Sequence, residues 1–392
     1  MINSLNKQIK VANIIEEGRI GGPQLRMALI ASALNKKIDT TLIFPKKNSS
    51  DFQKKCNELG IKYHLMPLTT IKRSWITMIT YIIFFPYEIV SLFLFLKKNN
   101  FNIVHLSGGS WQFKGIIAAK LANIKVIWEL NETYVPLVIK IIFYFLSNLS
   151  NCFIYASHKT KNYYKKLVPK VVKNFIIQSP VDISFFDPNI SYNLNNIEKT
   201  INLKKTIIGT VSNVNPVKGL DTLINAAKKL DYLKNEIIFL IIGAIHSNQK
   251  KYYGYLENLL KKNGLQNVYF LGKRNDIREL LSIMNIYICC SKYESSPLSV
   301  WEAMSMKKAI ISTNVGDVER FIDNKSNGLI VPSGDENLLA EAIKKFIKNP
   351  ELRIEYGKKS REIAEKQLNI ERCAQLNLEA YELISIKTES QK

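Results

Sequence analysis

The stretch TIIGTVSNVNPVKGLDTLINAAKKL, residues 206–230, predicts how this chain folds. It opens with a short β-branched run, which is typical of a strand, and continues into a helical pattern that begins near Gly219 or Asp221. Short strand-like runs alternate with longer helical patterns along the rest of the sequence in the same way. That alternation is typical of βαβ units, so we predict an α/β protein with parallel, Rossmann-like sheets.

The strand-like runs form two groups, one in each half of the chain. The first group lies at 9–15, 40–44, 102–106, 125–130, 153–157 and 175–179, and the second at 206–212, 237–243, 267–272, 286–291, 309–313 and 328–332. A chain of 392 residues is too long for one ordinary core, and a polar run around 187–206 could serve as a linker. We therefore expect two domains, at 1–185 and 200–368. Ligands of such sheets bind beyond the carboxyl ends of the strands, which predicts a site in a cleft where the domains face each other.

The charge and cysteine content narrow the possible partners. A net charge of +22 would attract nucleic acid, acidic membrane surfaces or phosphorylated substrates. We expect no nucleic-acid partner, because the sequence shows no nucleic-acid motif and its aromatic residues do not interleave with its basic ones. Five cysteines without a CxxC motif or a histidine cluster suggest neither a zinc site nor a disulfide framework. Cysteines of this kind fit a reducing compartment. The first residues, MINSLNKQIKV, lack the basic and then apolar pattern of a signal peptide, so we expect a cytoplasmic protein.

The apolar run WITMITYIIFFPYEIVSLFLFL, residues 75–96, is long enough to cross a bilayer. Pro86 would kink such a span, and Glu88 would place a carboxylate near its middle. We therefore favour a buried core helix, with a membrane-surface helix as the second interpretation and a true span as the third. A second apolar segment at 135–149 could widen such a membrane surface.

The segment YESSPLSVWEAM, residues 293–304, is the strongest candidate for a binding site. Ser295 and Ser296 are residues that cap helices, and Pro297 suits the first helical position, so unpaired amides would point at a ligand in front of the helix. Such an end favours an anion. Glu302 could accept hydrogen bonds from a vicinal diol such as ribose, while Glu294 enters from the preceding loop. The competing interpretation is an ordinary capped surface helix with two solvated carboxylates.

Two other loops follow the first predicted strand of each domain. Gly18, Gly21 and Gly22 precede a helix, but they lack the GxGxxG spacing and the later acidic residue, so we do not expect a dinucleotide cofactor. The glycine pair could let backbone approach a ligand, or could form a plain turn. In the second domain, Lys218 could neutralise a diphosphate and hold the charge that develops on a leaving phosphate, unless it is simply a solvated lysine.

Several motifs follow one another through the second domain: VNPVKGLDTLI, LIIGA, GLQNVYFLGKRNDI, CCSKYESSPLSVWEAMSMKKAIISTNVGDV and NGLIVPSGDENLLAEAI. From about 206 to 345 this ordered set resembles the retaining glycosyltransferases of family 4. The first domain resembles the family more weakly, through the glycine pair, NIVHLS, FIYASHKT and SPVDISFFDP. The resemblance implies the GT-B fold, a nucleotide-sugar donor, and a C-terminal helix over 369–392 that can pack back on the first domain.

The resemblance also implies residue roles. Glu302 would bind the donor ribose, Glu294 the transferred sugar, Lys218 the diphosphate, and Gly272 with Lys273 would flank the base. The predicted catalytic residues are Glu294, Lys218 and Asn131, and the predicted donor-binding residues are Glu302, Asn213, Ser295, Ser296, Pro297, Leu298, Ser299, Gly272, Lys273, Gly21 and Gly22. In such enzymes the departing phosphate is thought to take the acceptor proton, so no protein nucleophile is needed. The absence of an Asp-x-Asp triplet agrees with chemistry that needs no metal or other cofactor.

The sequence departs from the family pattern at several positions. Asn213 stands where an arginine is usual, which removes one cation expected at the diphosphate, and Asn131 replaces a histidine and cannot carry a proton at neutral pH. Asp317 replaces a second glycine, and Ser179 with Pro180 replaces an Asn-Gly pair between the domains. His105, at the end of a strand, is expected to be packed rather than catalytic.

These observations predict a cytoplasmic retaining glycosyltransferase that can lie at the inner face of the cell membrane. It would move a sugar from a nucleoside diphosphate to a glycan or lipid-linked acceptor, as in the synthesis of capsule, lipopolysaccharide or another cell-surface polysaccharide. Three alternatives stay open. A nucleotide-sugar epimerase of the same fold would release nucleotide without an acceptor, a non-catalytic GT-B subunit would bind nucleotide without turnover, and a nucleic-acid binder would show a steep dependence on salt.

Overall fold

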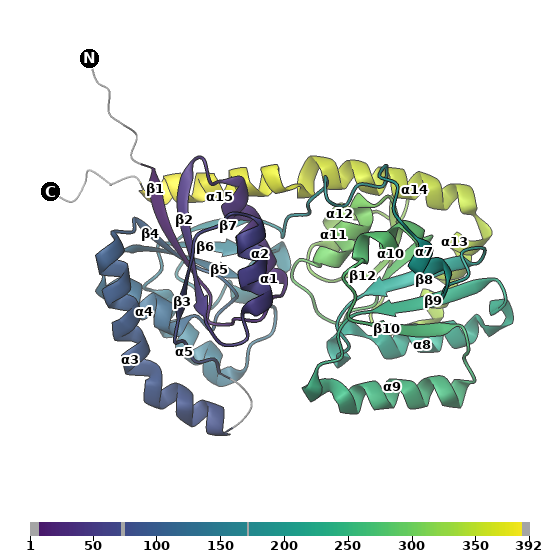
Figure 1. Cartoon of the computed structure of the whole chain (residues 1–392), viewed down its shortest axis with the longest axis horizontal. Helices are drawn as coiled ribbons and strands as arrows, with labels where there is room; N and C mark the ends of the chain where they lie inside the picture. Colours follow the sequence, from purple (N-terminus) through teal and green to yellow (C-terminus); the bar gives the residue numbers. More distant parts are fainter. Residues whose placement is uncertain (1–7, 72–74, 171, 386–392) are drawn as a thin grey trace, which may run out of the picture. The chain divides into compact units, whose positions relative to one another are not determined.

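The computed structural model describes residues 8–71, 75–170 and 172–385. The chain divides into two units, each built around its own parallel sheet (Figure 1). Unit 1 consists of Met1–Pro180 together with Ile370–Lys392, and unit 2 consists of Val181–Asn369. The first boundary thus falls at Pro180 rather than after residue 185.

The sheet of unit 1 contains seven strands in the described part of the chain, in the order β3-β2-β1-β4-β5-β6-β7, and all neighbours run parallel. The strands are β1 (Ile9–Ile14), β2 (Ile38–Pro45), β3 (Tyr63–Met66), β4 (Ile103–Leu106), β5 (Lys125–Leu130), β6 (Cys152–Tyr155) and β7 (Lys173–Ile176). The prediction of six strands missed β3. It is a four-residue edge strand in which only Met66 is buried, so its sequence lacks the apolar run that marks the central strands.

Helices cover both faces of this sheet (Figure 1). Their bounds are α1 (Gly22–Ala33), α2 (Ser50–Glu58), α3 (Trp75–Asn99), α4 (Phe113–Leu121), α5 (Leu137–Ser147), α6 (His158–Tyr164) and α15 (Ile370–Ser385). Apolar side chains of α3, α4 and α5 share one core with the sheet, whereas α1, α2 and α15 pack against the other face. The C-terminal helix α15 therefore belongs to unit 1, where its Ile384 carbonyl accepts a hydrogen bond from Lys125 Nζ at 2.8 Å.

Most of helix α3 lies outside the core, contrary to the interpretation favoured from the sequence. It continues as one helix through Pro86, and its ribbon bends along its length (Figure 1). Only Tyr81, Glu88, Ile89, Leu92 and Leu96 are buried, and just 28% of its most apolar window is covered by the protein. Hydropathy reports the apolar content of a segment but not which of its faces meets the protein, so the sequence could not separate these cases.

Unit 2 repeats the design with the strand order β10-β9-β8-β11-β12-β13, again all parallel. The six strands are β8 (Thr206–Val211), β9 (Ile237–Ile242), β10 (Val268–Gly272), β11 (Ile286–Cys289), β12 (Ala309–Thr313) and β13 (Gly328–Val331), which confirms all six predicted strands of this unit. The helices are α7 (Asn195–Glu198), η1 (Pro216–Lys218), α8 (Leu220–Lys229), η2 (Asp231–Leu233), η3 (Ser247–Gln249), α9 (Lys250–Asn263), α10 (Ile277–Ile283), α11 (Leu298–Ser305), α12 (Val318–Phe321), α13 (Glu336–Lys348), α14 (Pro350–Ile363) and η4 (Ala364–Leu368).

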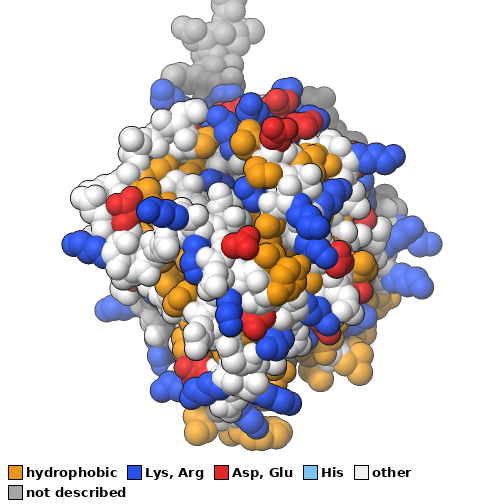
Figure 2. All heavy atoms as spheres, turned by 90° about the vertical axis from the view of Figure 1, so that its right-hand side faces the viewer, with side chains coloured by type: hydrophobic (Ala, Val, Ile, Leu, Met, Phe, Trp, Pro, Cys, Tyr) orange, Lys and Arg blue, Asp and Glu red, His pale blue; other side chains and the backbone are white. Residues whose placement is uncertain are grey.

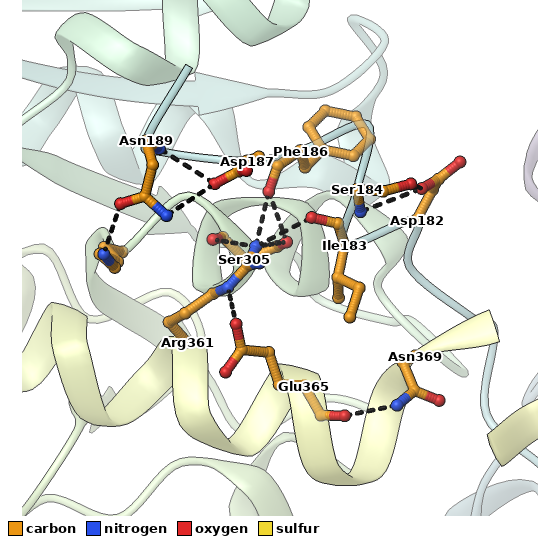
Figure 3. A network of polar contacts seen from close by, with 11 residues as sticks. Asp182, Ile183, Ser184, Phe186, Asp187, Asn189, Ser305, Arg361, Glu365 and Asn369 are labelled. Atoms are coloured by element: carbon orange, nitrogen blue, oxygen red, sulfur yellow. Dashed lines mark hydrogen bonds and ion pairs between the residues drawn. The ribbon is translucent and has the colours of Figure 1, made fainter. Parts of the chain in front are cut away.

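The segment that follows Pro180 is not a free linker, because it is fastened to unit 2. Val181, Phe186, Ile197 and Ile201 are buried in one of the two cores of that unit. Figure 3 shows Arg361 of α14 at the centre of a polar network, where its guanidinium donates to the carbonyls of Ile183, Phe186 and Ser305 at 2.8–3.1 Å. The buried apolar side chains and the hydrogen bonds of Arg361 explain why this polar stretch packs against unit 2.

The surface is strongly basic. Figure 2 shows one face of the molecule, on which Lys and Arg side chains are spread throughout and acidic side chains are fewer. On this face the positive charge forms no single stripe of the kind that tracks a nucleic-acid backbone. The five cysteines, all in the described part of the chain, are buried free thiols.

Candidate active site

The site residues follow the carboxyl ends of strands at the point where strand order reverses. In unit 1, β1 lies between β2 and β4, and in unit 2, β8 lies between β9 and β11. Loops that leave neighbouring strands to opposite sides open a crevice there, which is where ligands of such sheets bind. The Gly21–Gly22 loop follows β1, Lys218 follows β8, and Glu294 follows β11.

Lys218 and Glu294 form an ion pair between the loops after β8 and β11. Glu294 Oε1 also accepts a hydrogen bond from Ser291 Oγ at 3.0 Å. About a quarter of the Lys218 side chain and a fifth of the Glu294 side chain remain exposed, so the pair faces solvent. Burial opposes the charge on Lys218, but the adjacent carboxylate outweighs it and raises the lysine pKa. A cation that stays charged at neutral pH can hold a diphosphate.

Backbone geometry sets the position of this lysine. Gly219 lies at φ +63° and caps α8, and a side chain there would collide with the Cys290 carbonyl. Cys290 Sγ in turn lies 3.2 Å from the Lys218 carbonyl oxygen. The chain around Lys218 is therefore packed directly on the end of β11.

The helix after Glu294 begins later than predicted. Helix α11 starts at Leu298 with Pro297 as its N-cap and without a side-chain cap, so Ser295 and Ser296 are not its capping residues. Instead, Ser296 Oγ accepts a hydrogen bond from Trp301 Nε1 at 3.0 Å. The amides of Leu298 and Ser299 stand in the first turn, where a helix offers no carbonyl to them.

Glu302 lies one turn into α11, and its carboxylate makes no hydrogen bond or ion pair within the described part of the chain. Burial raises its pKa to about 8. A partly buried carboxylate without a partner is costly, so the fold holds a hydrogen-bond acceptor ready for a ligand. The vicinal hydroxyls of a sugar would satisfy both of its oxygens.

A contact missed by sequence reasoning positions the Glu294 loop. Gly316, after β12, has φ +53°, and a side chain there would run into the Ser295 carbonyl. Thr313 Oγ1 donates to the Ser291 carbonyl at 2.6 Å. The signal was available in part, since Thr313 ends a predicted strand and Gly316 follows it, but the pairing of the two loops is visible only in three dimensions.

The remaining donor-site candidates of unit 2 lie at neighbouring strand ends. Asn213 is exposed after β8, and its Oδ1 accepts a hydrogen bond from the Ala244 amide at 3.2 Å, so it serves the backbone rather than supplying a cation. Gly272, at the end of β10, has φ +66° with open space where a side chain would stand, and Lys273 beside it is exposed.

The candidates of unit 1 are less clearly arranged for binding. Gly21 caps α1 without a side-chain bond, and a side chain at Gly22 would meet nothing within 4 Å, so backbone there is accessible. Asn131 follows β5 and is half-buried. His105 is packed as expected, with Nδ1 2.8 Å from the Tyr381 hydroxyl and Nε2 3.3 Å from Glu129. Among the residues that the structure describes, no group of three metal-ligating side chains forms a cluster.

Known proteins match this chain in sequence and in fold. Residues 193–363 match the family model of glycosyl transferases group 1. The chain is 26% identical over 272 residues to the UDP-Gal:alpha-D-GlcNAc-diphosphoundecaprenol alpha-1,3-galactosyltransferase of Escherichia coli. The matched region covers 65% of this chain and 69% of that protein. It is 24% identical to the N,N'-diacetylbacillosaminyl-diphospho-undecaprenol alpha-1,3-N-acetylgalactosaminyltransferase of Campylobacter jejuni, over 85% of this chain and 88% of that one. The fold matches Anabaena HepE, solved with UDP and glucose, at a TM-score of 0.82 with 15% identity, over 96% of this chain and all of that one.

The fold and the relatives define a glycosyltransferase with the GT-B fold, as predicted. Within that class, residues 193–363 match the glycosyl transferases group 1, and this match covers most of unit 2. The narrower assignment to family 4 stays a prediction.

Proposed function

We propose that this glycosyltransferase moves a sugar, with retention of anomeric configuration, from a nucleoside diphosphate to a lipid-linked glycan. The product would serve the synthesis of a cell-surface polysaccharide. The observation that carries the proposal is the pairing of Lys218 with Glu294, together with a Glu302 carboxylate on the next helix that has no partner in the described chain. One cation and one vacant acceptor fit a diphosphate and a ribose diol.

Three groups of unit 2 would hold the donor. Lys218 would neutralise the diphosphate, the first amides of α11 would add partial positive charge, and Glu302 would accept from the ribose. The glycosidic bond to the phosphate would break as the acceptor hydroxyl attacks from the same side, and the departing phosphate oxygen would take the hydroxyl proton. Lys218 stabilises the charge on that phosphate, so this proposal needs neither a protein nucleophile nor a metal.

The acceptor assignment is supported by the two relatives named above, both of which act on diphosphoundecaprenol-linked sugars. A lipid-linked acceptor places the reaction at a membrane surface. Unit 1 carries the matching feature, because α3 and α5 each expose many large apolar side chains. On α3 these are Trp75, Ile76, Met78, Ile79, Ile82, Ile83, Phe84, Tyr87, Val90 and Leu94, and on α5 they are Leu137, Val138, Ile141, Ile142, Tyr144 and Phe145. We call these residues the apolar face.

We propose that the apolar face lies on the bilayer rather than crossing it. Helix α3 is long and apolar enough to span a membrane by composition. Its Glu88 side chain, however, is only 1% exposed and bonded to Lys114 and Thr69, so a spanning position would break these bonds and expose a carboxylate to hydrocarbon. The net charge of +22, with Lys97 and Lys98 at the end of α3, complements acidic headgroups.

Thermal unfolding with nucleotides tests the donor site. UDP, GDP, ADP and their common sugar conjugates are added one at a time, and a ligand at a hundred times its dissociation constant should add about 2.7 kcal/mol to the free energy of unfolding. The stabilisation should disappear in Glu302→Ala. No stabilisation by any of these ligands would contradict the proposal.

Vesicle flotation tests the membrane part separately. The full chain should float with vesicles of phosphatidylethanolamine and phosphatidylglycerol and less with neutral vesicles. Transfer to a polyprenyl diphosphate sugar in those vesicles, followed by NMR of the new linkage, tests acceptor and retention. Failure to float under both conditions would remove the membrane assignment while leaving the donor proposal intact.

Asn213 keeps one other function open. Its amide serves the Ala244 backbone where a second cation is expected at the diphosphate, which would suit a subunit that binds nucleotide without turning it over. Nucleotide-dependent stabilisation without any transfer or donor hydrolysis would favour that function.

A further inference from the structure

A buried ion cluster connects the apolar face to the loop after β1. Lys114 of α4 has no exposed side-chain surface, and its Nζ lies 2.5 Å from Glu88 Oε2 of α3 and 3.6 Å from Glu16 Oε2. Glu16 begins the loop that leads to Gly21 and Gly22. One amine thus holds two carboxylates, one from the helix that carries the apolar face and one from the glycine loop.

Further hydrogen bonds fix each branch of the cluster. On the α3 side, Thr69 donates its amide to Glu88 at 2.9 Å, its carbonyl accepts from Lys114 Nζ at 2.6 Å, and the same amine lies 3.9 Å from the centre of the Tyr81 ring. On the loop side, Glu16 Oε1 accepts from the Lys114 amide at 3.0 Å. The cluster is therefore bonded to its surroundings on both sides.

The loop side is also held rigidly. The Glu16 amide donates to Gln112 Oε1 at 2.9 Å, and a side chain at Gly18 would collide with the Lys47 carbonyl. The Glu17 carbonyl accepts from Gln24 of α1 at 2.9 Å. A displacement of Glu16 must therefore carry the start of α1, including its Gly21 cap, along with it.

A carboxylate drawn away from the shared Lys114 ammonium would be left without its cation in a medium of low polarity, so separating α3 from the loop is costly. We propose that Glu88, Lys114 and Glu16 are positioning residues which transmit the seating of α3 on a lipid bilayer to the Gly21–Gly22 loop. The inference rests on the membrane docking proposed above. It adds that the bilayer regulates the Gly21–Gly22 loop. Burial raises the pKa of Glu16 to about 7, which agrees with its weaker hold on the shared amine.

Hydrogen exchange of the full chain, with and without phosphatidylethanolamine–phosphatidylglycerol vesicles, tests the coupling. In the wild type, vesicles should slow exchange in residues 79–94 and also change exchange in residues 16–25 by at least about threefold. Glu16→Gln keeps the Lys114–Glu88 pair and should retain the first response but lose the second. Glu88→Gln cuts the other branch and should also lose the second.

Leu96→Ala is the matched control, because Leu96 is a buried residue of α3 outside the cluster. It should destabilise the helix yet keep the response of the loop. An unchanged loop response in Glu16→Gln, or a silent loop in a wild type whose α3 is protected, would overturn the proposal. If vesicles protect neither segment, membrane docking itself fails and the coupling fails with it, while nucleotide stabilisation stays an independent measure of the donor site.

A purely structural role is separated by kinetics. With a lipid-linked acceptor in vesicles, Glu16→Gln should raise the acceptor KM several-fold, with kcat and the donor dissociation constant little changed. Equal losses in all three would indicate general disruption and count against the proposal.

Discussion

The two units have the same sheet design but handle charge and apolar surface in opposite ways. Unit 2 holds Lys218 and Glu294 partly exposed in the loops after its strands, and it carries Glu302 on α11. Unit 1 buries its charged pair Lys114–Glu88 completely and exposes large apolar side chains on α3 and α5. Exposed charge at strand ends suits a small polar ligand, whereas exposed apolar area suits an extended apolar partner. The same fold is thus adapted to two kinds of binding.

The largest expected effect is on the stability of unit 1. Lys114→Met leaves Glu88 and Glu16 buried without their cation and should lower the free energy of unfolding by about 3 kcal/mol or more. Lys120→Met changes an exposed lysine of the same helix and should alter it by less than about 0.5 kcal/mol. Urea unfolding of both variants provides the measurement. Equal stability of the two would show that the buried cluster is not a structural requirement.

Lys218→Met should have the converse effect in unit 2, with stability almost kept and turnover lost. Removing the cation from the leaving phosphate should lower kcat about a hundredfold. Lys292→Met is the matched control, since Lys292 is 42% exposed in the adjoining loop. Steady-state transfer rates and melting curves of both variants would decide, and full activity in Lys218→Met would exclude the assigned role.

Glu302 should display a conflict between stability and binding. Its folded pKa of about 8 lies above the ordinary value of 4.5. The stability that protonation of Glu302 contributes to the folded protein is therefore complete below about pH 4.5, and it is lost as the pH rises through about 8. Glu302→Gln removes that loss and should be more stable than wild type by about 2 kcal/mol at high pH, a figure reduced because the carboxyl is partly open to solvent.

The measurement is urea unfolding at about pH 5 and pH 9, with and without the preferred nucleotide. The two proteins should agree at the lower pH and diverge at the higher one, and only the wild type should respond to nucleotide. A variant that is stabilised by nucleotide as strongly as the wild type would show that Glu302 does not hold the ribose.

The sequence predicted unit 2 better than unit 1, and the reason is physical. Its six strands are β-branched runs between clear helical patterns, and its two candidate carboxylates, Glu294 and Glu302, lie close together in the chain. Patterns of this kind depend only on residues that are near one another in the sequence. What escaped prediction was the start of α11 at Leu298 and the packing of Gly316 on Ser295, both of which depend on neighbouring loops.

In unit 1 the decisive contacts join residues that are far apart in the sequence. Lys114 meets Glu16 and Glu88 only because β1, α3 and α4 are brought together by the sheet. Sequence reasoning noted the carboxylate of Glu88 within the apolar run but had no means to name its partner. It also could not decide whether α3 turned its apolar residues inward, since composition is the same for a buried helix and for one that meets a membrane.

The smallest expected effect concerns the apolar face. Ile83 is 65% exposed, so Ile83→Asn should change the free energy of unfolding by no more than about 0.5 kcal/mol, whereas Leu92→Asn, at a fully buried position of the same helix, should cost far more. If the face meets a bilayer, Ile83→Asn should nevertheless weaken vesicle binding about tenfold, because it withdraws an apolar side chain from lipid. Flotation and urea unfolding of the same preparations separate the two effects. If Ile83 is needed for vesicle binding but not for stability, unit 1 exposes its apolar side chains for a membrane partner. Unaltered flotation of Ile83→Asn would instead show that the apolar face has no function at membranes.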